Sequence, residues 1–145
     1  MDVKIIAVAS IGNGVVRSTT ISNYKQLEDF LKIDLQANKM LMTLLASLNI
    51  FVDGALNFTI PEGYVTDGMS IPKWLQPIIG EPFEGNTIRA ALIHDYLCST
   101  KIRSQAFTHG IFGEMLKADG VSFWRRKAAY LAVVSYNRLK NPKWK

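Results

Sequence analysis

The first hydrophobic segments of the chain have the composition of strands. Residues 3–9 and 15–21 are rich in Val, Ile and Thr, and the glycine-containing segment GNG at residues 12–14 separates them. A short glycine turn between two such runs predicts a β-hairpin. Asp53-Gly54 divides NIFV from ALNFTI in the same manner and predicts a second hairpin.

Between these two hairpins the apolar spacing changes to that of helices. Residues 22–32 space their apolar side chains at three and four positions behind Ser22 or Asn23 as a cap, which predicts a short amphipathic helix. Residues 36–48 carry one apolar stripe and indicate a second helix, although a buried strand is an alternative that periodicity does not exclude. Residues 61–68 are expected to be extended, and the proline-rich residues 72–86 to form a loop.

The remaining chain has helical periodicity throughout. Three helices are predicted over Asn86–Ser99, Ser104–Ala118 and Ser122–Lys140, with the first residue of each as its N-cap and Gly120 as a stop. Strands and short helices followed by three helices predict an α+β fold rather than an alternating parallel sheet. A chain of 145 residues has the size of one domain, so a single domain over residues 1–145 is expected.

Composition narrows the class of protein. An apolar fraction of 48% with only 20% charged residues favours a folded globular chain over a disordered one. The N-terminal segment is too short and wrongly charged for a secretory signal. The apolar stretch Met40–Val52 is shorter than the roughly 20 residues of a membrane span, so no transmembrane helix is expected. Cys98 alone forms no internal disulfide and is compatible with a reducing cytoplasm.

Positive charge is concentrated at the C-terminal end. The net charge is +5, and Asp119 is the last acidic residue. The cations after it are Arg125, Arg126, Lys127, Arg138, Lys140, Lys143 and Lys145, the last two within a basic tail at residues 141–145. Such an end attracts acidic protein surfaces, nucleic acid or lipid headgroups, while a solvated helix face is the simpler interpretation.

A polar turn offers the first candidate for chemistry. Within IPEGYVTDGMSIP, residues 60–72, the side chains of Thr66, Asp67 and Ser70 are crowded between glycines and prolines. Asp67 could cap backbone amides or project a carboxylate into a cleft. Capping is the more common role of an Asp before a Gly in a turn.

His94 and Asp95 lie within an apolar helical run, so at least one of them is expected to be partly buried and to need a polar partner. Consecutive helical residues point about 100° apart, so these two side chains should not bond each other. The candidate partners are Asp67, Ser70, Arg89 and His109. If the second long helix packs antiparallel to the first, His109 would face His94 or Asp95.

Three roles are open for this group. His94, His109 and Asp95 could bind a divalent metal such as zinc, because imidazole and carboxylate are its usual ligands. Without metal, His94 could act as a general base on water, with Asp67 or Asp95 orienting it and Ser70 nearby. The third role is a buried polar contact that only stabilises the fold, which is the commonest fate of a lone His on an apolar face.

The segments IPEGYVTDGMSIPKWLQPIIG, RAALIHDYLCST and IFGEMLKADGVSFWRRKAAYLAV together resemble the DUF1353 family of small phage and prophage proteins. The resemblance covers about residues 58–136 and leaves residues 1–57 unmatched. It implies a phage origin and a site in which Thr66, Asp67, Ser70, His94, Asp95 and Tyr96 come together. It implies no particular reaction, and His109 stands where the family usually has an acidic residue.

Three functions follow as expectations. The first is a structural component of the phage virion, at the tail or neck, made in the host cytoplasm and bound to other virion proteins, with self-association also open. Its support includes three tryptophans, Trp74, Trp124 and Trp144, a residue type favoured at interfaces. The second is a cell-wall-directed hydrolase that uses His94 with Asp67 or Asp95. The third is a nucleic-acid-binding accessory protein, because FWRRK and NPKWK interleave aromatic and basic residues.

Overall fold

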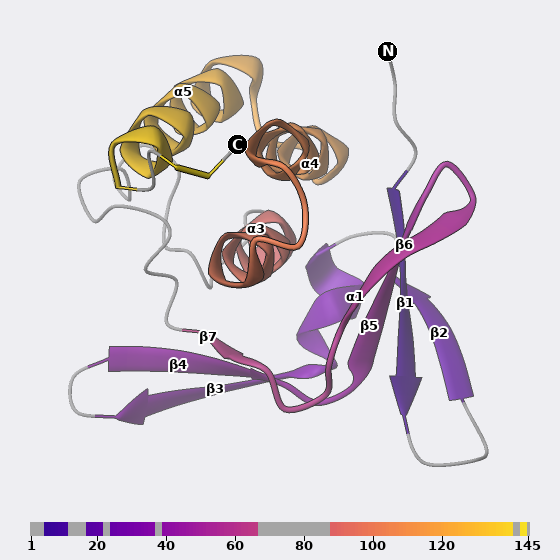
Figure 1. Ribbon diagram of the computed structural model, residues 1–145. Coiled ribbons are helices and arrows are strands. Elements are labelled where there is room, and N and C mark those ends of the chain that lie inside the picture. Colours follow the sequence, from indigo (N-terminus) through magenta and orange to yellow (C-terminus); the bar gives the residue numbers. More distant parts are fainter. Residues whose placement is uncertain are drawn as a thin grey trace. The chain divides into compact units, whose positions relative to one another are not determined.

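The computed structural model describes residues 5–11, 17–21, 24–36, 39–66, 88–140 and 143–144. The chain divides into two compact units, residues 1–67 and residues 68–145. The first contains two small antiparallel sheets and the second contains three helices, so the predicted α+β fold is confirmed (Figure 1). That both units belong to a single domain stays a prediction.

The larger sheet contains both predicted hairpins. Its strands are β1 (Ile5–Ile11), β2 (Arg17–Ile21), β5 (Ser47–Val52) and β6 (Ala55–Ile60), in the order β2-β1-β5-β6 with all neighbours antiparallel. The β5–β6 turn places Asp53 at φ 51° and Gly54 at φ 86°. Positive φ at both turn positions is the requirement of the tight hairpin turn that Asp-Gly predicts. The turn at residues 12–14 lies outside the described residues.

The smaller sheet corrects the first helical prediction. Its strands are β3 (Leu31–Gln36), β4 (Lys39–Leu44) and β7 (Val65–Thr66), in the order β3-β4-β7. The helix predicted over residues 22–32 is only α1 (Tyr24–Glu28), and the chain turns into β3 directly after it. Apolar and polar residues alternate from Leu31, and pairing with β4 outweighs the helical spacing of the preceding apolar residues.

The predicted helix over residues 36–48 is also wrong, and the alternative strand is correct. This segment forms β4 and the start of β5, joined by a bend at Leu45 and Ala46. Burial alternates along β4 and β5, with Met42, Leu44, Leu48 and Ile50 as the buried positions. Residues 61–68 were expected to be extended, but residues 61–64 form a turn before β7, and Gly63 has a φ of 87° there.

The second unit confirms the three predicted helices. They are α3 (Ile88–Thr100), α4 (Gln105–Ala118) and α5 (Phe123–Lys140). Ser104 is the N-cap of α4, where its Oγ accepts a hydrogen bond of 3.1 Å from the Phe107 N–H. α5 begins directly after Ser122, whereas Asn86 and the loop over residues 72–86 lie outside the described residues.

The end of α4 shows why Gly120 stops it. Gly120 has a φ of 81°, a left-handed conformation that costs other residues energy. Its N–H donates to the Lys117 carbonyl at 3.1 Å, and the Val121 N–H donates to the Leu116 carbonyl at 3.0 Å. This pair of bonds is the Schellman arrangement, with buried Val121 and Leu116 at its apolar positions.

α3 is the most buried helix of the described chain. Nine of its thirteen residues are buried, among them the polar Arg89, His94 and Asp95. A helix buried on nearly all sides leaves its polar side chains no access to water, so each requires a partner inside the protein. None of the helices in the described ranges is long and apolar enough to cross a membrane.

Candidate functional site

His94 and His109 face each other inside the helical unit. A connection of four residues joins α3 to α4, and the two helices bring His94 Nε2 within 3.2 Å of His109 Nδ1. The two side chains are 0% and 2% exposed, respectively. The Phe112 ring, one turn further along α4, lies 4.7 Å from the His94 ring. The contact expected between His94 and His109 is therefore present, in a closed and largely apolar setting.

Burial keeps both imidazoles neutral at neutral pH. It lowers the pKa of His94 from 6.5 to about 3, and the neighbouring charge of His109 contributes to the same decrease. Burial also lowers the pKa of His109 to about 4, helped by the positive charge of Arg138. A direct bond between two imidazoles needs one N–H donor and one lone pair, which two neutral rings provide.

Cys98 is half-buried one helical turn after His94 and lies against its ring. Its Sγ is 3.5 Å from His94 Nε2 and 3.7 Å from His94 Nδ1. Burial and the nearby carboxylate of Asp95 raise the pKa of the Cys98 thiol to about 12, against the opposite effect of Lys101. The sulfur therefore remains a protonated thiol, whereas a cysteine nucleophile needs a thiolate.

Trp144 near the C-terminal end packs against His109. The Trp144 ring lies 5.9 Å from the His109 ring, edge to face. Trp144 Nε1 donates to the Arg103 carbonyl at 3.0 Å, and Gln105 Nε2 donates to the Trp144 carbonyl at 3.2 Å. The interface role suggested for Trp144 thus competes with a structural one, because this side chain packs within its own unit.

The unpaired nitrogen of His109 favours one distribution of the protons. His109 Nε2 is buried and has no hydrogen-bond partner among the described residues. If His94 donated, His109 would carry a buried N–H without an acceptor, which is rare in proteins. If His109 Nδ1–H donates, Nε2 keeps only a lone pair, and His94 carries its proton on Nδ1 near the weak acceptor Cys98 Sγ. The second arrangement leaves no buried donor unpaired at His109.

The other predicted site residues are only partly placed. Asp95 is buried, with 8% exposure, and Tyr96 is half-buried on the same helix. Asp67 and Ser70 lie outside the described residues, so their expected approach to His94 stays a prediction. Within the described ranges, no group of three or more His, Cys, Asp and Glu side chains could hold a metal ion. The described positions of His94, His109 and Asp95 thus do not form the metal cluster considered from the sequence.

A buried ion pair was missed by the sequence reasoning. Arg89 Nε lies 2.9 Å from Asp119 Oδ2, and their side chains are only 2% and 0% exposed. The pair joins the start of α3 to the C-terminal end of α4. Arg89 was considered only as a partner for His94 or Asp95. The available signal was an arginine inside the apolar run IRAALI, because a buried guanidinium requires a carboxylate.

Removal of the His94 side chain tests the structural importance of the pair. His94→Ala leaves His109 Nδ1 buried without its partner and opens a space beside Phe112. We expect the free energy of unfolding to fall by about 1–3 kcal/mol, measured by urea denaturation at pH 7. Thr100→Ala, at an exposed position of the same helix, should change it by less than about 0.5 kcal/mol. Equal stability of the His94 variant and the wild type would contradict this assignment.

Comparison with known proteins identifies relatives of this chain. It is 44% identical over 89 residues to the uncharacterized protein y4jT of Sinorhizobium fredii. These aligned residues cover 61% of this chain and 25% of y4jT. It is 39% identical over 79 residues to the uncharacterized protein y4iH of the same organism, covering 54% of this chain and 31% of y4iH. The chain thus matches about a quarter to a third of these longer relatives. No solved structure matches it.

The chain also matches a known protein family. The family described as "Protein of unknown function (DUF1353)" matches residues 42–133. The match begins before residue 58, where the motif resemblance begins, so it includes half of β4, all of β5 and the start of β6, which were expected to be unmatched. The region also contains both histidines and the Arg89–Asp119 pair. Because the match spans more than half of the chain, this protein belongs to the DUF1353 family.

Proposed function

We propose that this protein is a structural component of a phage particle, at the tail or neck, and that it binds an acidic neighbouring protein through α5. The observation that supports this role is the exposed surface of α5, where large apolar side chains lie among cations. The most exposed apolar positions are Trp124 at 77%, Leu131 at 55% and Leu139 at 86%. Exposed apolar side chains bordered by charge are typical of surfaces that bind other proteins.

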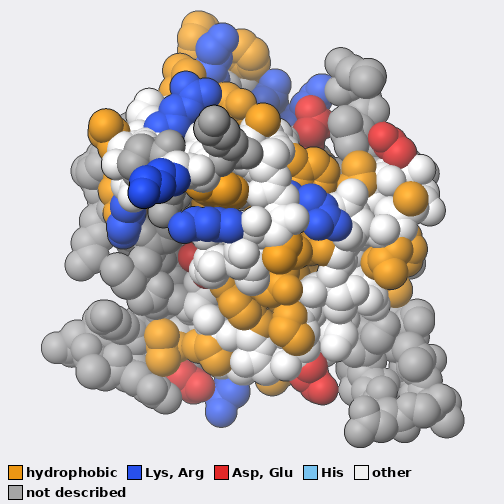
Figure 2. Space-filling model, in the orientation of Figure 1, with side chains coloured by type: hydrophobic (Ala, Val, Ile, Leu, Met, Phe, Trp, Pro, Cys, Tyr) orange, Lys and Arg blue, Asp and Glu red, His pale blue; other side chains and the backbone are white. Residues whose placement is uncertain are grey.

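The charge of α5 defines the partner that it favours. The helix carries five cations, Arg125, Arg126, Lys127, Arg138 and Lys140, and no acidic residue. Figure 2 shows Lys and Arg side chains around hydrophobic ones over the helical unit. Such a surface attracts an acidic partner from a distance and repels other basic surfaces. The phage context is supported by the motif resemblance over residues 58–136.

Burial of the histidines favours this role over the hydrolase. A general base must reach the proton that it abstracts, whereas His94 is 0% exposed and bonded to His109. Both imidazoles have pKa values far below neutrality because they are buried. A low-pKa base without solvent access is better suited to holding two helices together than to activating water.

Incorporation into particles tests the proposal. We expect the chain to be present at a constant ratio to the coat protein in washed, density-purified particles of the phage that encodes it, measured by quantitative mass spectrometry. The double variant Trp124→Ser/Leu131→Ser removes two exposed apolar contacts and should lower incorporation about tenfold. Abundant chain in the lysate but none in the particles would reject the structural role.

A matched control separates the contact surface from a general loss of apolar side chains. Leu56 in β6 is 58% exposed, close to the exposure of Leu131, but it lies in the other unit. Leu56→Ser should leave incorporation unchanged. Equal losses for Leu56→Ser and for the α5 variant would remove the reason for assigning the contact to α5.

A further inference from the structure

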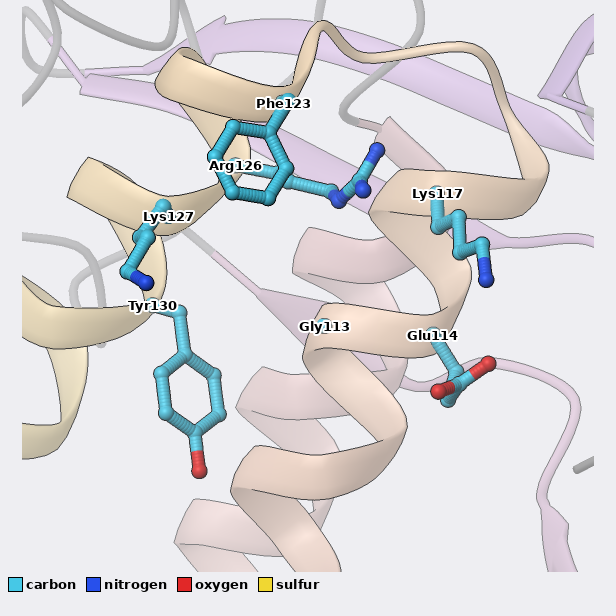
Figure 3. A pocket seen from close by; sticks show the side chains of 7 residues that line it. All are labelled: Gly113, Glu114, Lys117, Phe123, Arg126, Lys127 and Tyr130. Carbon is cyan, nitrogen blue, oxygen red and sulfur yellow. The ribbon is translucent and has the colours of Figure 1, made fainter. Parts of the chain in front are cut away.

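A pocket of about 320 Å³ lies between α4 and α5, wholly within the helical unit. Its lining residues are Gly113, Glu114, Lys117, Phe123, Arg126, Lys127 and Tyr130. Figure 3 shows Phe123, Lys127 and Tyr130 on α5 and Glu114 and Lys117 on α4, with Gly113 between them on the α4 backbone. The volume is at the small end of the range for ligand pockets and suits one or two side chains of a partner.

Gly113 contributes to the shape of this pocket. A Cβ atom at this position would lie 3.4 Å from Tyr130 Cδ2, so the Tyr130 ring packs against α4 at Gly113. Phe123 is 51% exposed and Tyr130 is 37% exposed, both on α5. The pocket therefore presents aromatic surface that remains accessible to a binding partner.

The charges around the pocket are mostly positive. Lys117, Arg126 and Lys127 outnumber the one carboxylate, that of Glu114. The Arg126 guanidinium lies 5.3 Å and the Lys127 ammonium 5.6 Å from the centre of the Phe123 ring. Cation–π attraction at these distances holds both cations beside an apolar surface. A carboxylate bound here would pair with cations that are already positioned. Apolar groups next to that carboxylate in the ligand would pack on the Phe123 and Tyr130 rings.

We propose that the α4–α5 pocket binds an acidic peptide segment of a neighbouring protein, in which a carboxylate side chain lies next to an apolar one. The carboxylate pairs with Lys127 and Arg126, and the apolar side chain packs on Tyr130. The Glu114 carboxylate can accept a hydrogen bond from a backbone N–H of the peptide, whereas Lys and Arg side chains can only donate. This inference rests on the proposed function and specifies which part of α5 recognises the partner.

Three observations favour a peptide over nucleic acid. The Phe123 ring already packs against two cations and lies 5.2 Å from the Trp124 ring, which leaves less of its surface for stacking on a base. The Glu114 carboxylate can accept a hydrogen bond from a peptide N–H, which a phosphate backbone does not offer. Leu131 is exposed one turn after Lys127 and adds aliphatic surface. Such surface can pack against apolar groups of a protein partner but does not bind phosphate.

Binding of defined probes by the full chain tests the inference. The positive probe is a fluorescein-labelled peptide of about twelve residues with alternating Glu and Leu. The controls are a peptide with alternating Glu and Ser, and an oligo-dT strand with the same number of charges. Fluorescence anisotropy should show saturable binding of the Glu-Leu peptide, at least about tenfold tighter than either control, and weaker at high salt.

Variants connect that binding to the pocket. Lys127→Glu reverses one exposed lining charge and should weaken Glu-Leu peptide binding about tenfold. Lys25→Glu makes the same charge change at an exposed position of α1 and should have no effect. Tyr130→Ala should weaken binding of the Glu-Leu peptide but leave the residual binding of the Glu-Ser peptide unchanged. Circular dichroism would verify that each variant remains folded.

The other results separate a failure of the pocket inference from a failure of the structural role. It is rejected if the Glu-Leu peptide does not bind at protein concentrations up to about 0.5 mM, or if Lys25→Glu weakens binding as much as Lys127→Glu. Tighter binding of oligo-dT would assign the surface to nucleic acid. Because particle incorporation is a separate measurement, an α5-dependent incorporation without peptide binding would reject the pocket alone. Peptide binding without incorporation would reject only the structural role.

Discussion

Arg89→Ala should lower the free energy of unfolding by about 3–5 kcal/mol, the largest effect that we expect from one substitution. The variant leaves the Asp119 carboxylate buried and without the guanidinium that lies 2.9 Å from it. A buried charge without its partner costs far more than the pair contributes, because desolvation of the remaining charge is no longer offset. Urea denaturation at pH 7 measures the change.

Two comparisons make this result specific. Asp119→Ala should cost a similar amount, and the double variant Arg89→Ala/Asp119→Ala should cost about 1–3 kcal/mol less than the sum of the two single variants. Lys32 and Asp34 form an exposed ion pair at 3.6 Å, so Lys32→Ala should cost less than about 1 kcal/mol. Additive losses in the double variant would show that the two buried charges do not stabilise each other.

Acid should destabilise the protein strongly between pH 6.5 and pH 4, and the histidine pair is the reason. The unfolded chain binds protons at His94 and His109 near their ordinary pKa of 6.5, while the folded pKa values are about 3 and 4. The unfolded state therefore binds more protons in this window, so the free energy of unfolding decreases as the pH falls. The contribution of the histidine pair to the free energy of unfolding is complete above pH 6.5. On the order of 3 kcal/mol or more of it is lost by pH 4.

The matched control keeps every carboxylate and removes only the imidazoles. In His94→Gln/His109→Gln, urea denaturation from pH 7 to pH 4 should show a clearly smaller decrease than in the wild type. An NMR titration of the wild-type imidazole protons supplies a second measurement that does not depend on a stable variant. Imidazole signals that titrate near pH 6.5 in the folded protein, or equal pH dependence in both proteins, would contradict the role of the pair.

The proposed roles divide the helical unit into an inner and an outer part. The inner part is the buried polar group, in which the histidine pair and the Arg89–Asp119 pair connect α3 to α4. The outer part is the exposed surface of α5 with its cations and apolar side chains. We expect the inner contacts to keep the helices rigid, because a binding surface that is held in place loses less conformational freedom when a partner binds.

The sequence by itself determined the local features of this protein. The Asp53-Gly54 hairpin, the cap at Ser104 and the stop at Gly120 depend on backbone conformations that a few neighbouring residues select. The order of elements then predicted the α+β class, and the motifs HDYL and TDG pointed to the family. These signals are local, so they can be interpreted without knowledge of the folded chain.

Only the tertiary structure decided the features that depend on distant partners. Residues 31–36 and 39–44 are strands because they pair with each other in an antiparallel register, although helices were predicted over residues 22–32 and 36–48. Asp119 became the partner of Arg89, and His109 of His94, through the packing of α4 on α3. Burial in that packing makes both imidazoles and the Cys98 thiol neutral, because low polarity penalises charge. The sequence shows which of these side chains are present. Their protonation and their partners depend on their burial and on the distances between them in the folded chain.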